Sequence, residues 1–364
     1  MPQPGDLDFK AIRAGLQRIA AQPFDVDRDE PKPAPRRWIK IATIAGLSIL
    51  LLPLLTISGF RLASVLRETR TAAELAPPTG RFVTTSQGRI FIQEKGDATA
   101  PPVILIHGTA AWSELWREMI DHLAGAGFRV IAIDLPPFGF SDRPANRDYT
   151  RAAQSARIAA LIEALSLKNV TLVGHSFGAG PTVETIMRYP ANIRGLVLIA
   201  GALGVTEASG SPPALVDWVL RTDTIRNPLV ATFVTNPMMT RTLLSSMVYR
   251  KDAADARRAA ILQRPMTLRG TTPDLGPWLV YFTGRDEQAW SMDRARYATI
   301  KVKTQLLWGD KDTLTPLPQG RDINSLIAGS ELTVIPDIGH IPQIEDPAHF
   351  APLLTEAVRK VSQR

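Results

Sequence analysis

The 364-residue sequence contains no cysteine and only five histidines. Without cysteine there is no disulfide, no thiolate nucleophile and no cysteine-ligated zinc or iron–sulfur site, although the redox compartment stays open. The net charge of +7 is spread along the chain, with no run of basic residues and no interleaved aromatic residues. Because no metal-ligand cluster or phosphate-binding loop is visible either, we expect neither a nucleic-acid partner nor a cofactor.

What the sequence does contain is one long apolar segment, residues 41–60, which reads IATIAGLSILLLPLLTISGF. In a helix, 20 uncharged residues cover about 30 Å, the thickness of the hydrocarbon core of a bilayer. We therefore predict a transmembrane anchor over residues 38–61 that contacts the lipid bilayer. A cleaved signal peptide fits less well, because its charged region would be unusually long and no A-x-A site follows. A buried core helix is the remaining alternative.

The charges around this segment indicate its orientation. Five Lys or Arg residues lie in the fifteen positions before residue 41, and three lie in the fifteen after residue 60. This excess favours a cytoplasmic N-terminus and places the large C-terminal part of the chain on the other side. Arg outnumbers Lys, as in GC-rich bacterial genomes. We therefore expect a single-pass protein of a bacterial inner membrane whose C-terminal part is periplasmic, with an N-terminal tail at residues 1–37 and a linker at 62–79.

From residue 80 onward the pattern is that of an α/β domain. Two strands, RFVTT and RIFIQEK, are joined by a short turn, and apolar runs of strand length then alternate with helical patterns. This predicts a mostly parallel sheet with helices on both faces. The alternation stops between residues 203 and 298, which predicts a helical cap over the sheet edge where ligands bind. The predicted domains are a core in two parts, 80–202 and 299–364, and a cap, 203–298.

The segment NVTLV is followed by GHSFG, with Ser176 at its centre. The pattern G-x-S-x-G is weak alone, but after a strand and before a helical pattern it is typical of a nucleophile elbow. Glycines are needed there because the sharp turn brings strand and helix close together. Ser176 is therefore the candidate nucleophile.

A serine hydroxyl needs a base that removes its proton and a carboxylate that orients this base. With this elbow the expected chain order is serine, acid, histidine. His340 lies in a loop after the last predicted strand, whereas two histidines precede the elbow, one belongs to it, and His349 falls on a predicted helix. The segment WGDKD offers both Asp310 and Asp312 as the acid, and its position alone does not choose between them.

These segments together resemble the α/β-hydrolase superfamily, in its serine-nucleophile branch with an inserted cap domain. The resemblance begins near residue 80 and continues to the C-terminus. HGTAAWSELW, residues 107–116, is similar to the oxyanion loop, and DLPPFGFSDRP, residues 134–144, to the loop after the fourth strand. WGDKD and GHIPQIEDP are similar to the acid and histidine segments. The acid of the family stands three residues after the glycine, which implies Asp312. Pro137 departs from the family's usual glycine, so this loop must turn differently.

The resemblance also implies a role for each residue. Ser176 would attack a carbonyl carbon, His340 would take its proton, and Asp312 would orient His340. The backbone N–H groups of Thr109 and Phe177 would hold the oxyanion, and one such donor contributes about 2.7–4 kcal/mol to transition-state stabilisation. Serine at the elbow argues against haloalkane dehalogenases and epoxide hydrolases, which use aspartate there.

Apolar residues in and near the cap suggest the substrate. Trp218 and Met238 belong to the cap and Trp112 to the segment similar to the oxyanion loop. Such side chains form either the core of the cap or an apolar pocket; we take these three as candidate substrate contacts. Together with the membrane anchor, they predict a small lipophilic substrate and a serine hydrolase of carboxylic esters.

Three other functions stay open. Carbon–carbon bond hydrolysis of dienoic diketo acids needs cationic partners for the substrate carboxylates, and the cap contains Arg221, Arg226, Arg241 and Arg250. A cofactor-free perhydrolase of the same fold is a second alternative. The third belongs to another class, a catalytically idle binding module at the membrane; the competent residues at every triad position argue against it.

Overall fold

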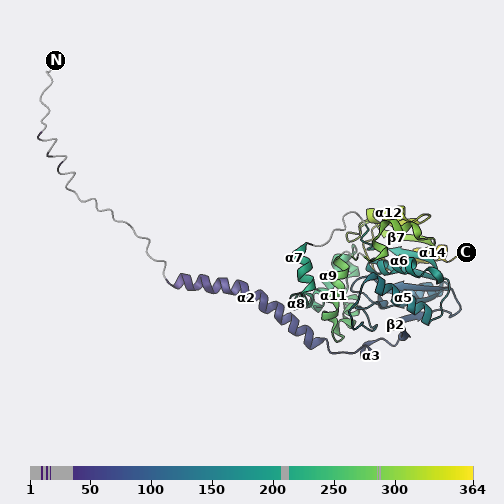
Figure 1. Cartoon of the computed structure of the whole chain (residues 1–364), viewed down its shortest axis with the longest axis horizontal. Helices are drawn as coiled ribbons and strands as arrows, with labels where there is room; N and C mark the ends of the chain where they lie inside the picture. The colour runs from purple at the N-terminus through teal and green to yellow at the C-terminus, as the bar shows by residue number, and fades with distance from the viewer. Residues whose placement is uncertain are drawn as a thin grey trace, which may run out of the picture. The chain divides into compact units, whose positions relative to one another are not determined.

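The computed structural model describes residues 10, 14, 17, 36–205, 213–284, 286 and 288–363. The predicted tail, residues 1–37, therefore lies almost entirely outside the described residues. The chain divides into two compact units, Met1–Leu54 and Leu55–Arg364, which are taken separately here. The sheet, the cap and the candidate site all belong to the second unit (Figure 1).

The predicted membrane anchor lies in helix α2 (Arg36–Arg67). Residues 37–67 of this helix are long and apolar enough to cross a membrane, by length and composition. The large apolar side chains between Trp38 and Leu55 that the structure describes are exposed to solvent. The helix does not end at residue 61, the predicted end of the anchor, but continues to Arg67.

The second unit contains an eight-stranded sheet with the order β1-β2-β4-β3-β5-β6-β7-β8. The hairpin β1–β2 is antiparallel, β2 is antiparallel to β4, and the remaining neighbours are parallel. The sheet is therefore mostly parallel, as the sequence pattern predicts. Its strands are β1 (Gly80–Thr85), β2 (Gly88–Lys95), β3 (Pro102–Ile106), β4 (Arg129–Ile133), β5 (Val170–His175), β6 (Ile193–Ile199), β7 (Lys303–Gly309) and β8 (Glu331–Ile335).

Helices cover both faces of the sheet, and each face has its own apolar core. Successive side chains of a strand point to opposite faces, so Ile104 and Ile106 of β3 join one core while Val103 and Leu105 join the other. Burial on both faces explains why the parallel strands are continuous apolar runs. The first core contains side chains of α5 (Arg151–Ala164), α6 (Ala179–Arg188) and α12 (Leu317–Leu326), and the second contains those of α4 (Arg117–Gly125) and α14 (Pro347–Ser362).

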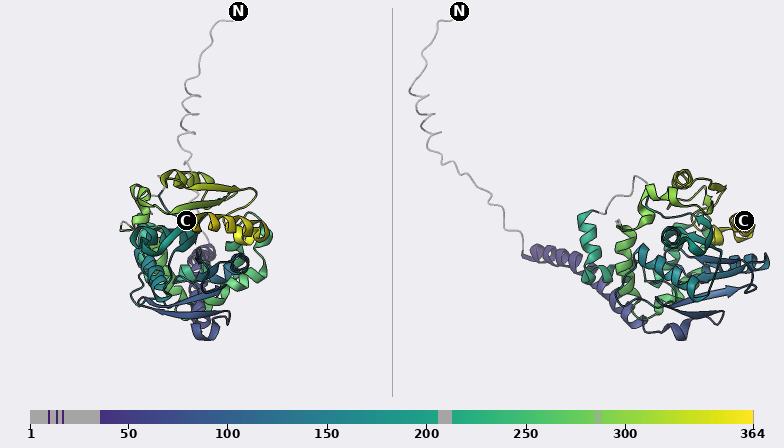
Figure 2. Two further views of the ribbon diagram at one scale, coloured as in Figure 1. Left: turned by 90° about the vertical axis from the view of Figure 1, so that its right-hand side faces the viewer. Right: turned by 45° about the vertical axis from the view of Figure 1, so that its right-hand side comes forward.

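The cap is inserted between β6 and β7, so the chain leaves the sheet after Ile199 and returns at Lys303. Its helices lie together at one end of the sheet, as Figure 1 and the right-hand view of Figure 2 show. They are α7 (Ala214–Arg221), α8 (Asp223–Phe233), α9 (Pro237–Met247), α10 (Ala256–Gln263) and α11 (Thr271–Thr283), with the short 3-10 helices η4 (Lys251–Ala253), η5 (Arg264–Thr267), η6 (Trp290–Met292) and η7 (Arg294–Thr299).

Short elements connect these parts, and one of them, η2, begins at the candidate nucleophile Ser176. They lie at strand ends and in the turns between the sheet and its helices. They are α3 (Ala72–Leu75), η1 (Ser113–Trp116), η2 (Ser176–Gly178), η3 (Pro190–Asn192) and α13 (Pro342–Glu345).

The segment predicted as a linker, residues 62–79, packs on the cap. Arg67 Nη2 donates to the main-chain O of Thr235 at 2.7 Å. The buried carboxylate of Glu68 accepts hydrogen bonds from the main-chain N–H of Thr272, at 2.9 Å, and from its hydroxyl. Arg70 forms a parallel bridge with Leu268. Residues 62–79 therefore belong to the second unit and contact the cap, although their sequence is typical of a linker.

Candidate active site

Ser176 follows β5 directly, where the strand turns into η2 and then α6. Its φ of 52° lies in the left-handed region that residues other than glycine seldom adopt. A Cβ atom at Gly174 would lie 2.6 Å from Thr182 Oγ1, and one at Gly178 would lie 2.4 Å from the main-chain O of His107. Only glycine fits at these two positions. The tight turn holds the Ser176 hydroxyl at the carboxyl edge of the sheet.

Three of the predicted residues meet at this edge from distant parts of the chain. Ser176 Oγ lies 2.7 Å from His340 Nε2, and His340 Nδ1 lies 2.8 Å from Asp312 Oδ2. All three side chains are buried. Because Asp312 is ionised, Nδ1 of His340 carries the proton and donates it to the carboxylate, which leaves Nε2 free to accept from the serine hydroxyl. This is the arrangement that activates a serine nucleophile.

The choice between the two aspartates is settled by position. Asp312 lies in the loop after β7 and faces His340, whereas Asp310 points elsewhere. The Asp310 carboxylate accepts from the main-chain N–H of Asp337 at 2.7 Å and pairs with Lys311 at 2.8 Å. Asp310 therefore ties the loop after β7 to the loop after β8 and does not contact His340.

Four hydrogen bonds fix the Asp312 carboxylate. Besides His340, its Oδ1 accepts from the main-chain N–H groups of Leu314 and Thr315, both at 2.9 Å, and its Oδ2 accepts from the Thr315 hydroxyl at 2.7 Å. Burial by itself would raise the pKa of Asp312. The hydrogen bonds from His340 and Thr315 outweigh burial, so the pKa of this carboxyl is held below its usual value. Asp312 therefore stays ionised at neutral pH.

Glu345 positions the histidine loop, and nothing in the sequence beyond its nearness to His340 marks it. Its buried carboxylate accepts from the main-chain N–H of Gly339 at 2.9 Å and of Ile341 at 3.0 Å, the two neighbours of His340. It also accepts from the main-chain N–H groups of Tyr249 and Arg250 in the cap, at 2.9 and 3.0 Å. One carboxylate thus joins the catalytic loop to the cap.

The other histidines near the elbow are structural. Burial lowers the pKa of His107 to about 4, so its imidazole is neutral. His107 Nε2 accepts from the main-chain N–H of Leu135 at 2.9 Å, so its Nδ1 donates to the main-chain O of Gly108 at 2.8 Å. Burial, and next the nearby His340, lower the pKa of His175 to about 3, and its Nε2 donates to the main-chain O of His340 at 2.9 Å.

The expected oxyanion donors flank the nucleophile. A Cβ atom at Gly108 would lie 2.9 Å from Cβ of Ser176, so the backbone that leads into Thr109 runs directly against the serine. Phe177 follows Ser176 within the single turn of η2, where main-chain N–H groups have no partner within the helix. Both N–H groups thus belong to backbone next to Ser176.

A cavity of about 360 Å³ opens onto Ser176 and His340. This volume lies within the range of small-molecule sites. Thr109 and Ala110 form part of its wall on the core side, and side chains of the cap form most of the rest. The cap contributes Thr240 and the apolar residues Val234, Leu243, Leu244, Met247, Leu262, Met266, Trp278, Leu279 and Phe282. We call this the main cavity, and its wall is almost wholly apolar.

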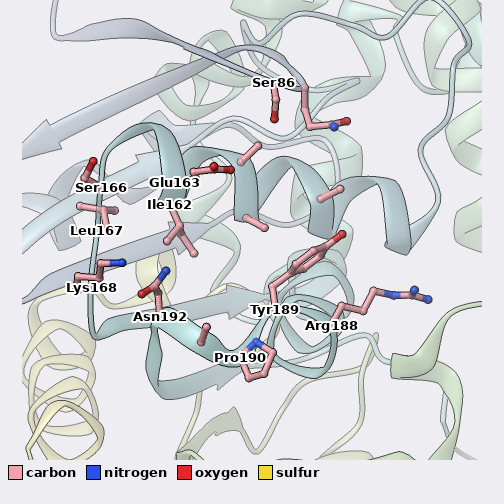
Figure 3. A pocket seen from close by; sticks show the side chains of 15 residues that line it. Ser86, Ile162, Glu163, Ser166, Leu167, Lys168, Arg188, Tyr189, Pro190 and Asn192 are labelled. Carbon is pink, nitrogen blue, oxygen red and sulfur yellow. The ribbon is translucent and has the colours of Figure 1, made fainter.

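A larger hollow of about 870 Å³ lies on the core, away from the triad. Figure 3 shows that side chains of α5, including Ile162 and Glu163, border it together with Tyr189 and Pro190 from the connection after α6. None of the three triad residues lines it. Its size therefore does not make it the site of the chemistry.

A family model described as the alpha/beta hydrolase fold matches residues 101–347. The chain belongs to the alpha/beta hydrolase family. This match covers the sheet from β3 to β8, the cap and all three triad residues. The family prediction made from the sequence motifs is thereby confirmed.

The relatives and solved structures that resemble this hydrolase carry several different enzyme names. It is 28% identical over 297 residues to a 2-hydroxy-6-oxononadienedioate/2-hydroxy-6-oxononatrienedioate hydrolase of Escherichia coli (strain K12), across 76% of this chain and 94% of the relative. Among solved structures, an esterase of Exiguobacterium antarcticum has a TM-score of 0.62 at 23% identity, covering 77% of this chain and 99% of its own. A bacterial membrane phospholipase A has a TM-score of 0.63 at 21% identity, covering 90% of this chain and 98% of its own. The two structures share the fold.

The three predicted substrate contacts need correction, because none of them lines the main cavity of the hydrolase. Trp112 is buried, with its Nε1 donating to the main-chain O of Ile261 at 2.8 Å and its ring packed against Phe140. Trp218 on α7 and Met238 on α9 are 55% and 78% exposed. Other apolar residues of the cap line the main cavity in place of these three.

The four cap arginines are also absent from the lining of the main cavity. Arg221 pairs with Asp217, Arg226 with Asp223 and Arg250 with Asp346. Arg241 Nε donates to the main-chain O of Ala254 at 2.9 Å. Each of the four thus serves the structure of the cap or its attachment.

Proposed function

We propose that this hydrolase cleaves carboxylic esters with an apolar acyl or alcohol group, through a covalent acyl-enzyme. One observation carries the proposal. The hydrogen-bonded series from Ser176 through His340 to Asp312 opens into a cavity whose wall is almost wholly apolar. An activated serine supplies the chemistry, and the apolar wall selects uncharged, lipophilic groups next to the reacting carbonyl.

In the acylation step, Ser176 Oγ attacks the ester carbonyl carbon while His340 Nε2 takes its proton. The N–H groups of Thr109 and Phe177 stabilise the negative oxygen of the tetrahedral intermediate. His340 then gives the proton to the departing alcohol, and Asp312 stabilises the imidazolium meanwhile.

In the deacylation step, a water molecule repeats the sequence. His340 takes a proton from the water as the resulting hydroxide attacks the acyl carbon, and the acid leaves as the proton returns to Ser176 Oγ. Asp312 holds the same tautomer of His340 throughout, so one base serves both steps.

The location proposed for this activity is the membrane surface. Helix α2 would anchor the chain in a bacterial inner membrane through residues 41–60, with the catalytic unit in the periplasm. The length and composition of α2 support an anchor, and the basic residues before it support this orientation. Fractionation of cells that express the full chain tests the anchor. Protease added to intact spheroplasts tests the side, because a periplasmic unit is digested and a cytoplasmic one is protected.

The activity is tested with a series of 4-nitrophenyl esters from acetate to laurate and the detergent-solubilised full chain. We expect turnover that rises with chain length until the main cavity is filled. Ser176→Ala should abolish the turnover and leave thermal unfolding unchanged within a few degrees. Absence of turnover at every chain length in a folded wild-type protein would refute the proposal.

Carbon–carbon bond hydrolysis is the second candidate, and the Escherichia coli relative supports it. Against it, the predicted cationic partners Arg221, Arg226, Arg241 and Arg250 pair or bond elsewhere in the cap. Loss of the dienol absorbance of a 2-hydroxy-6-oxodienoate, followed beside the ester assay, distinguishes the two. An idle binding module would show neither activity.

A further inference from the structure

A second hollow adjoins the main cavity and has a different chemical character. This side cavity measures about 280 Å³. It shares four lining residues with the main cavity, which are Ala202, Phe282, Leu314 and Thr315. The shared residues lie close to the triad, because Thr315 donates to Asp312 and the main-chain N–H of Ala202 donates to the main-chain O of Ser176 at 3.0 Å. The two hollows therefore share part of their wall close to the nucleophile.

Polar groups line the side cavity, in contrast to the main cavity. Thr283 and Gln319 belong to its wall, as does Tyr149, whose buried hydroxyl has no hydrogen-bond partner among the described residues. Among the lining residues that the structure describes, Arg151 is the only charged one.

The Arg151 guanidinium is held against the floor of the side cavity by neutral groups. Its Nη1 donates to the main-chain O of Leu203 at 2.8 Å and to Ser291 Oγ at 3.2 Å, and its Nη2 donates to the main-chain O of Ala202 at 3.4 Å. A Cβ atom at Gly204, which also lines the cavity, would lie 3.7 Å from Nη2. The cation thus sits at the wall with part of its donor capacity unused.

Of the other arginines with little exposed surface, Arg143 pairs with Asp274 and Arg226 with Asp223. Arg157 instead bonds to neutral acceptors, Gln154 Oε1 and the main-chain O of Asp148. Arg151 has no such ion pair within the described residues, which omit 285 and 287 of the adjoining loop. Asp286 in that loop accepts from the main-chain N–H of Arg151 at 3.3 Å. Burial lowers the pKa of Arg151, and the nearby carboxylates of Glu184 and Asp286 oppose this lowering without forming an ion pair with the guanidinium. A half-buried guanidinium whose hydrogen-bond partners are all neutral can take an anion, and its planar donors match a carboxylate.

We propose that the side cavity binds a carboxylate of the substrate through Arg151. The natural substrate is then an amphiphilic ester, with an apolar half in the main cavity and a half that carries a carboxylate in the side cavity. The single cation matches a monoanion better than a phosphate dianion. This inference rests on the proposed ester hydrolysis and adds the class of the second half of the substrate.

The test compares two matched pairs of esters in the detergent-solubilised full chain. For a carboxylate on the acyl half, the pair is 4-nitrophenyl hydrogen glutarate and 4-nitrophenyl pentanoate. For a carboxylate on the alcohol half, the pair is 4-(octanoyloxy)benzoate and 4-(octanoyloxy)benzamide. The measured quantity is the ratio of kcat/KM for the anionic ester to that for its neutral partner, with kcat and KM determined separately.

The variants are Arg151→Gln, Arg151→Lys and the control Arg194→Gln. Arg194 is half-buried on β6, bonds to Asn169 Oδ1 and lies outside both cavities. In at least one pair we expect Arg151→Gln to lower the ratio about ten-fold or more, mainly through KM, since a hydrogen bond to a charged group is worth at least that factor. Arg151→Lys should retain part of the preference and remain folded, and Arg194→Gln should leave the ratio unchanged.

A purely structural role of Arg151 would lower both members of a pair equally and leave the ratio unchanged, which overturns the inference while ester hydrolysis stands. If Arg151→Gln does not fold, Arg151→Lys takes its place in the test. The inference is then overturned if the wild type and Arg151→Lys have the same ratio, neither prefers the anionic ester, and Arg151→Lys is only less stable. If the wild type cleaves none of the four esters, the proposed function falls and this inference falls with it.

Discussion

Replacement of Asp312 by asparagine changes which way the proton on His340 points. In the wild type, His340 Nδ1–H donates to Asp312 Oδ2 across 2.8 Å, and Nε2 accepts from Ser176. In Asp312→Asn, the Oδ1 atom can still accept from the N–H groups of Leu314 and Thr315, so the loop keeps its shape. An amide nitrogen, however, stands where Oδ2 was, and it donates to Nδ1. The proton of the imidazole then moves to Nε2, which can no longer accept from the serine.

The structure thus predicts loss of the base without loss of the fold. A histidine held in the wrong tautomer costs about 10⁴-fold in kcat in serine hydrolases with the same constellation. We expect a fall of that order for Asp312→Asn, in the turnover of a 4-nitrophenyl ester of medium chain length. The change in the free energy of unfolding should be small by comparison, because two of the four hydrogen bonds to the carboxylate survive.

Asp310→Asn is the matched control, because it removes a carboxylate two residues away in the same loop. Asp310 faces Asp337 and Lys311 and makes no contact with His340. We expect kcat to stay within about three-fold of the wild type, since the exposed ion pair contributes at most about 1 kcal/mol. Equal losses in the two variants, or a larger loss in Asp310→Asn, would refute the assignment of the acid and the reasoning from the tautomer.

Two further predictions follow from the cap and the segment that packs on it. Met247→Trp should fill part of the main cavity and shift the best substrate in a 4-nitrophenyl ester series to a shorter chain, whereas Trp218→Ala should not; an unchanged chain-length profile in Met247→Trp would exclude this cavity as the acyl or alcohol site. Glu68→Ala leaves the buried main-chain N–H of Thr272 unpaired, which costs about 1–3 kcal/mol, although the Thr272 hydroxyl keeps its bond to Thr235 Oγ1. Hydrogen exchange over residues 68–76 should therefore accelerate. Burial raises the pKa of Glu68 despite its bonds to Thr272. The stability that comes from this shift is present at acid pH and is lost as the pH rises through the pKa of the folded state. Glu68→Gln should therefore flatten the pH dependence of hydrogen exchange over these residues, and a pH dependence equal to that of the wild type would contradict this prediction.

The triad could be predicted because its signals are local. Ser176 stands in a glycine-rich turn after an apolar strand. Glycine is required at positions 174 and 178 because a Cβ atom at either would lie less than 3 Å from neighbouring atoms. His340 and Asp312 each follow a strand at the carboxyl edge of the sheet. In a mostly parallel sheet these edges meet, so a correct strand assignment already brings the three side chains together.

The substrate contacts could not be predicted because they depend on how the cap helices are rotated. Met238 and Met247 both lie on α9, but Met238 is 78% exposed while Met247 lines the main cavity. Trp218 and Trp278 differ in the same way. Composition shows that the cap is apolar, but only tertiary packing decides which side of each helix faces the triad.

Two other features were hidden for a related reason. Glu68 and Glu345 are buried carboxylates that accept main-chain hydrogen bonds from residues distant in sequence. A carboxylate that ties loops together has no periodicity and no motif, since its partners are N–H groups that every residue except proline carries. Residues 62–79 therefore resemble a linker in sequence although they pack on the cap.

The central claim is that Ser176 is an activated nucleophile, and labelling tests it most directly. Detergent-solubilised full chain is treated with a fluorophosphonate probe, beside Ser176→Ala and Asp310→Asn, and the labelled peptide is identified by mass spectrometry. The account predicts a single label on Ser176, absent in Ser176→Ala and retained in Asp310→Asn. A folded wild-type protein that hydrolyses esters but carries the label on another residue, or that never reacts with the probe, would contradict it.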